Sequence, residues 1–190
     1  MGIIQAGSLI RLFNMRPIGE IVFYSFPDNL IIDSMGTGRI PTVEIYYAKT
    51  GEFTISVFTT MMRQQYIDSL TNRERNILLS ALLYTMNLID SKFLITIDCV
   101  STADKNRKAY LIVNSPRLVE KFRNREEYAL IEGKRVRNTL SLIVAMARFT
   151  KIPAVQLILP IRELAESNVQ LCLQHLVSLI KEAFVYIGDK

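Results

Sequence analysis

The chain has 190 residues, of which 49% are hydrophobic and 22% are charged. This apolar share is too high for an intrinsically disordered protein, and the length is sufficient to bury a sizeable core. Two cysteines and one histidine exclude a disulfide scaffold, a four-cysteine zinc site and a multi-histidine metal centre within one subunit. The net charge of +5 adds a moderate basic bias to this globular composition.

The first half of the chain is predicted to be rich in strands. Short β-rich runs cover residues 20–26 and 29–35. The clearest pattern lies between Thr42 and Thr60, where two alternating runs flank a turn that contains Gly51. A period of two on both sides of such a turn predicts a β-hairpin, with Gly51 in the left-handed conformation.

A helix is predicted after this hairpin. Thr71 and Glu74 have the spacing of a capping box, in which each side chain satisfies an N–H group at the start of the helix. Apolar residues from Ile77 to Ile89 recur at helical spacing. One face of the helix is therefore expected to be buried.

The second half is predicted to mix strands and helices. Strands at 93–100 and 109–114, joined by a polar link, predict a second hairpin. Helices are expected from Pro116, from about Val136 to Phe149 and from about Arg162 to Tyr186, with a strand at 154–159. Because the sequence contains no repeat and no flexible linker, we expect a single α+β domain over residues 1–190. Its antiparallel sheet would be built from two β-hairpins covered by helices, with a long C-terminal helix.

The positive charge is concentrated in the middle of the chain. Residues 61–151 carry 16 Lys and Arg against 9 Asp and Glu, whereas the segments on either side are each slightly acidic. Such a segment is suited to attract a polyanion and to release counterions from a phosphate backbone. The residues predicted to contact phosphates are Lys105, Arg107, Lys108, Arg117, Lys121, Arg125, Lys134, Arg135 and Arg137.

These basic residues lead to our first functional hypothesis, a non-enzymatic nucleic-acid-binding protein with DNA or RNA as its partner. Tyr110, Phe122 and Tyr128 lie among them and could stack on single-stranded bases. The basic run could instead be an ordinary solvated face. A third reading is a structural or assembly subunit whose basic patch meets an acidic protein.

An enzymatic alternative rests on Glu132-Gly133-Lys134. This triplet, after an apolar run and before a helix and a strand, resembles the acidic-x-Lys motif of the PD-(D/E)xK nucleases. The resemblance implies that Glu132 binds Mg²⁺ beside an upstream Asp98 or Asp104, and that Lys134 steadies water or phosphate. Asp90-Ser91-Lys92 is a second triplet of this kind, so a coincidental charged turn stays open. Only this alternative requires a cofactor.

The C-terminal helix carries two further features. Cys172 and His175 are three residues apart, the raw material of a nucleophilic dyad, but their apolar surroundings favour core packing or an interface. The helix is also apolar on more than one side, which is consistent with either internal burial or a homo-oligomer. We expect a homodimer or higher homo-oligomer through a seam formed by Val169, Leu173, Leu176, Ile180, Phe184 and Ile187.

Signals for export or membrane insertion are not found in the sequence. The first residues lack the order of a signal peptide, and no window reaches about 18 uninterrupted apolar residues. We therefore expect a cytoplasmic or nucleoid-associated protein with reduced thiols and no membrane partner.

Overall fold

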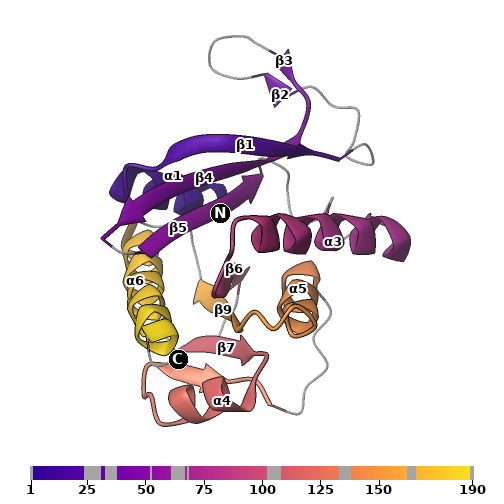
Figure 1. Ribbon diagram of the computed structural model, residues 1–190. Helices are drawn as coiled ribbons and strands as arrows, with labels where there is room; N and C mark the ends of the chain where they lie inside the picture. Colours follow the sequence, from indigo (N-terminus) through magenta and orange to yellow (C-terminus); the bar gives the residue numbers. More distant parts are fainter. Residues whose placement is uncertain are drawn as a thin grey trace. The chain divides into compact units, whose positions relative to one another are not determined.

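The computed structural model describes residues 2–23, 31–32, 38–51, 53–60, 67, 69–101, 108–132, 138–161 and 166–188. The chain divides into two compact units, an N-terminal unit, Gly2–Leu78, and a C-terminal unit, Leu79–Lys190 (Figure 1). That the whole chain forms one domain stays a prediction.

The N-terminal unit contains an antiparallel sheet with strand order β1-β4-β5. The hairpin predicted around Gly51 is confirmed, because β4 and β5 pair from Val43 opposite Thr60 to Thr50 opposite Phe53. Gly51 has φ +62°, a left-handed conformation that favours glycine. The described elements of this unit are α1 (Gly2–Leu12), β1 (Arg16–Val22), β2 (Ile31–Ile32), β3 (Gly38–Arg39), β4 (Thr42–Thr50) and β5 (Phe53–Thr60).

The beginning of the chain differs from the sequence analysis. α1 lies against β5, although no helix was predicted there. The strand expected at 20–26 begins earlier, at Arg16, and β2 covers Ile31–Ile32 of the run expected at 29–35. The remaining residues of those two runs lie largely outside the described part of the chain.

Helix α3 (Asn72–Leu88) spans the boundary between the two units and begins as predicted. The backbone N–H of Thr71 donates to Glu74 Oε2 at 2.9 Å, and the backbone N–H of Glu74 donates to Thr71 Oγ1 at 3.3 Å. This reciprocal pair is the predicted capping box.

The C-terminal unit is built on a mixed sheet with strand order β6-β9-β7-β8. β9 runs parallel to β6 and antiparallel to β7, while β8 runs parallel to β7. The described elements are β6 (Leu94–Ser101), β7 (Ala109–Val113), α4 (Pro116–Arg123), β8 (Tyr128–Leu130), α5 (Thr139–Ala147), β9 (Ala154–Ile161) and α6 (Glu166–Gly188).

The predicted second hairpin is wrong, because β9 lies between β6 and β7. Residues 154–159 are all buried, as a central strand covered by helices on both faces must be. The α+β class, an antiparallel sheet that contains the Gly51 hairpin and the long C-terminal helix are confirmed, and that sheet has three strands. The second sheet is mixed rather than antiparallel.

Helices cover both faces of the mixed sheet. Val155, Leu157 and Leu159 of β9 belong to a core cluster that also contains residues of α4 and α6. The side chain of Gln156 points to the opposite face of the sheet, where it is hydrogen-bonded to Ser141 of α5. Accordingly, α4 and α6 pack on one face and α5 on the other.

Helix α6 buries a different stripe from the predicted seam. Its buried residues are spaced by four and three, and among the predicted seam residues that the structure describes, only Leu176 is fully buried. Over the described residues, α6 from Gln170 to Gly188 is the one helix long and apolar enough to cross a membrane. Core packing accounts for its buried face, and the homo-oligomer stays a prediction. The buried residues are Cys172, Leu176, Leu179, Ala183 and Tyr186.

Candidate functional site

Helix α4 carries two of the predicted phosphate contacts, Arg117 and Lys121, and its start follows from local sequence. The Ser115 side chain accepts a hydrogen bond from the Leu118 N–H, and Pro116 occupies the first helical position, where its missing N–H costs little. Leu118 and Phe122 are buried on the inner face. The helix ends at Arg123, so Arg125 follows it rather than extending the helical stripe.

The basic residues of this segment are paired with α6. Lys121 Nζ lies 3.1 Å from Glu182 Oε2, and the Arg125 guanidinium donates to Oε1 of the same carboxylate. The Lys121 and Glu182 side chains are only 19% and 20% exposed, so this ion pair is largely shielded from water. One carboxylate therefore compensates two of the predicted phosphate contacts.

Arg117 also contacts α6. Its guanidinium carbon lies 4.6 Å from the centroid of the Tyr186 ring, a cation–π arrangement. Tyr186 in turn packs edge-to-face against Phe93 at 5.7 Å between centroids. We call the set Arg117, Lys121, Arg125, Glu182 and Tyr186 the α4–α6 contact. These contacts engage the predicted basic stripe within the chain, although Arg117 and Arg125 remain exposed.

The other predicted contacts are not gathered into this set. Lys108 is exposed just before β7, and Lys105, Arg107, Lys134, Arg135 and Arg137 lie outside the described residues. The proposed stacking residues Phe122 and Tyr128 are buried and pack edge-to-face on each other at 5.9 Å. These two rings are core residues, and that part of the sequence interpretation is corrected.

The nuclease residues do not form a metal site in the described part of the chain. Glu132 lies beyond the end of β8, is exposed, and pairs with Arg123 at 3.4 Å. Lys134 and Asp104 lie outside the described residues. Among the residues that the structure describes, no three His, Cys, Asp or Glu side chains come together to hold a metal ion.

Asp98, the other candidate for that metal site, is part of a hydrogen-bond network between β6 and α5. Its Oδ2 accepts from Asn138 Nδ2 at 2.9 Å, and Asn138 Oδ1 caps α5 by accepting from the Ser141 N–H at 2.6 Å. Ser141 Oγ then donates to Oε1 of the fully buried Gln156 at 2.6 Å. The network fixes the start of α5 on the sheet, and the sequence analysis missed it.

Cys172 and His175 have different surroundings in the structure. Cys172 is buried in the core cluster, and Cys99 packs against the same cluster. The His175 ring is 5.6 Å from that of Tyr128. The structure agrees with the predicted core packing of Cys172.

Acidification should destabilise the protein partly through His175. Burial lowers the pKa of His175 below its ordinary 6.5, so the unfolded chain binds a proton here more readily than the folded chain. The stabilising contribution is complete above about pH 6.5 and is lost as the pH falls from there toward the folded pKa. Urea unfolding at about pH 7.5 and 5.5 should show a smaller loss for His175→Gln than for the wild type. Equal losses of stability in the variant and the wild type would contradict this role of His175.

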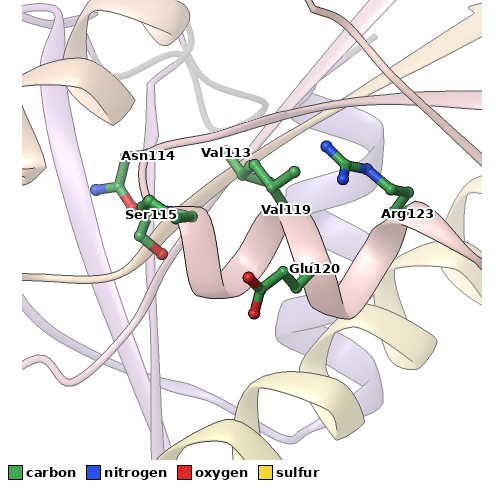
Figure 2. Close-up of a pocket in the computed structure, with 7 residues that line it drawn as sticks. Val113, Asn114, Ser115, Val119, Glu120 and Arg123 are labelled. Atoms are coloured by element: carbon green, nitrogen blue, oxygen red, sulfur yellow. The ribbon is translucent and has the colours of Figure 1, made fainter.

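A pocket of about 380 Å³ lies where β7 meets α4 (Figure 2). Its apolar wall is formed by Val113, Pro116 and Val119. Glu120 contributes a carboxylate, and within the described residues this carboxylate has no hydrogen-bond or ion-pair partner. Sequence analysis had not singled out this site, since its residues surround it only after α4 has packed on the sheet.

The other polar residues of the pocket have partners within the chain. Asn114 Oδ1 accepts from the Ala154 N–H at 2.8 Å, and its Nδ2 donates to the Ile152 carbonyl at 2.9 Å. Ser115 caps α4, and Arg123 pairs with Glu132. The charge left for a ligand is therefore the negative charge of Glu120.

No family model matches the sequence, and no curated protein matches it significantly. Solved structures do match. PbaB from Pyrococcus furiosus, described as an archaeal proteasome activator, is similar with a TM-score of 0.73 at 11% identity, covering 94% of this chain and 86% of PbaB. The chain has the fold of this protein.

Two further structures support the same fold. A proteasome-assembly chaperone homologue from Mycobacterium tuberculosis has a TM-score of 0.67 at 12% identity, covering 97% of this chain and 85% of its own. PbaA from Pyrococcus furiosus, an archaeal homologue of proteasome-assembly chaperone, has a TM-score of 0.65 at 14% identity, covering 98% and 83%.

The predicted nucleic-acid-binding function, with DNA or RNA as partner, is wrong. The structures above are described as a proteasome activator and as homologues of proteasome-assembly chaperones, and none as a nucleic-acid-binding protein. The physical reason for the error lies in the α4–α6 contact. Three of the positive charges that look available in the sequence, those of Arg117, Lys121 and Arg125, are engaged by Glu182 and Tyr186.

Proposed function

We propose that the chain binds protein partners and assists the assembly of a multi-subunit protein complex, with proteasome subunits as the partner class. The observation that carries this proposal is the fold, because the match to the chaperone homologues covers 97% and 98% of the chain. The pairing of Lys121 and Arg125 with Glu182 of α6 gives independent support, because it compensates two charges that a phosphate backbone would need.

The pocket beside α4 is the contact point that we propose for such a partner. Its apolar wall suits the methylene groups of a long side chain, and Glu120 at its rim suits a positive charge. Since the charge of Arg123 is compensated by Glu132, a lysine or arginine of the partner is the complementary occupant. This reverses the polarity of the assembly alternative in the sequence analysis, which expected an acidic partner.

Glu120→Lys should weaken binding to the partner by about tenfold, equivalent to about 1.4 kcal/mol, because a favourable charge pair becomes repulsive. The measurement is the dissociation constant for immobilised protein and proteasome subunits of the source organism. Glu126→Lys makes the same charge change at another exposed glutamate and serves as the matched control. Equal weakening in both variants would show that net charge, not the pocket, determines binding.

The proposed function itself is tested by adding labelled DNA and labelled RNA, in parallel with the proteasome subunits, to the same immobilised protein. The proposal predicts saturable binding of the proteasome subunits and no specific binding of either nucleic acid. Binding of nucleic acid with a steep salt dependence, without binding of the subunits, would overturn it.

A further inference from the structure

The two cysteines of the chain lie far apart in the sequence and close together in the fold. Cys99 is on β6 and Cys172 is on α6, 73 positions later. Cys99 packs against the core cluster to which Cys172 belongs. Both are free thiols. Phe93, six positions before Cys99, packs against Tyr186, fourteen positions after Cys172, at 5.7 Å between ring centroids. At about 3.3 Å per strand residue and about 1.5 Å per helix residue these two spans are nearly equal in length, so β6 and α6 bring the two cysteines to the same level of the core.

The two thiols differ in their access to solvent. Cys172 is 2% exposed, whereas Cys99 is only half-buried. A small oxidant can therefore reach Cys99 first, while Cys172 is held beside it. The neighbourhood is otherwise apolar, with Ile97, Leu157 and Leu179 in the same cluster or packed against it. No competing thiol exists in the sequence.

We propose that Cys99 and Cys172 form a reversible intramolecular disulfide when the protein meets a peroxide. This site is independent of the proposed function. The disulfide would tie β6 to α6, the helix that supplies Glu182 and Tyr186 to the α4–α6 contact.

The chemistry balances with hydrogen peroxide as the oxidant. The Cys99 sulfur attacks one peroxide oxygen, the O–O bond breaks, and Cys99 becomes a sulfenic acid while one water leaves. The Cys172 sulfur then attacks the Cys99 sulfur, and the leaving hydroxide takes the Cys172 proton as a second water. Two thiols have lost two electrons and two protons. A dithiol reductant reverses the step.

The order of these events agrees with the state of Cys172. The neighbouring Cys99 side chain and burial raise the pKa of the Cys172 thiol far above its ordinary value of 9.0. Cys172 is therefore protonated in the reduced protein and is poorly suited to be the first nucleophile. Its proximity to Cys99 makes it the resolving thiol.

The experiment treats the full-length protein with hydrogen peroxide and measures the intact mass under non-reducing conditions. We expect a monomer that is about 2 Da lighter, with one peptide pair linking Cys99 to Cys172 after proteolysis. The midpoint of thermal unfolding should rise by about 5–15 °C and return after reduction, because the cross-link restricts the unfolded chain. Cys99→Ala and Cys172→Ala should each abolish the mass loss.

A second measurement keeps the proposal testable if either variant fails to fold. In a glutathione redox buffer, the equilibrium constant for disulfide formation should be about 30-fold or more higher in the folded protein than in concentrated urea. The proposal is overturned if the folded protein forms no internal disulfide, forms only intermolecular ones, or gains nothing over the unfolded chain.

Discussion

Replacing Phe122 with alanine should lower the free energy of unfolding of the C-terminal unit by about 4 kcal/mol. The side chain is 1% exposed and lies in the core cluster between α4, the sheet and α6. Its removal leaves a cavity and takes away the edge-to-face contact with Tyr128. Urea unfolding followed by circular dichroism measures the change.

The matched control for this substitution is Phe149→Ala. Phe149 is 87% exposed just after α5, so its loss should change stability by less than about 0.5 kcal/mol. Similar costs for the two substitutions would contradict the assignment of Phe122 to the core. They would also remove the basis for placing α4 on the sheet.

Glu182→Ala should cost about 2 kcal/mol, the second-largest effect that we expect. One carboxylate, 20% exposed, compensates both Lys121 and Arg125, so its removal leaves two cations without their partner. The cost should lie between that of an exposed ion pair and that of a fully buried one, because water still reaches part of Arg125.

Two comparisons make the Glu182 prediction specific. Glu120→Gln removes a carboxylate that has no partner among the described residues, and should change stability by less than about 0.5 kcal/mol. Glu182→Gln keeps the shape and the hydrogen-bonding oxygen, and should cost less than Glu182→Ala. If Glu182→Ala is as mild as Glu120→Gln, the α4–α6 contact does not stabilise the unit.

The elements that sequence analysis predicted well are those determined by neighbouring residues. Gly51 and the alternation around it depend on a turn and on its two flanking strands, and the structure has both. The capping box of Thr71 and Glu74 and the start of α4 at Pro116 likewise involve residues three positions apart or fewer. Interactions between neighbouring residues are sufficient to specify these elements.

The elements that it missed depend on contacts between distant residues. β9 pairs with β6, about 60 positions earlier, and separates two strands that are neighbours in sequence. The apolar run from Ala154 to Leu159 was a signal for a central strand, but it does not specify which strands lie beside it. The same limit explains why the seam chosen on α6 differs from the stripe that is buried in the core.

The candidate functional site also depends on contacts between residues that are distant in the sequence. The spacing of Arg117 and Lys121 correctly indicated one face of a helix. Nothing near them in the sequence shows that Glu182 and Tyr186 lie opposite, because those residues follow more than 60 positions later. The carboxylate of Glu120, which has no partner among the described residues, became informative only after the partners of its neighbours were known.

The most direct test of the central claim is size-exclusion chromatography with light scattering on a mixture of this protein and proteasome subunits of the source organism. The proposed assembly role predicts a discrete complex that contains this protein, with faster or more complete association of the subunits when it is present. Separate elution of this protein, with association of the subunits unchanged by its addition, would contradict the account.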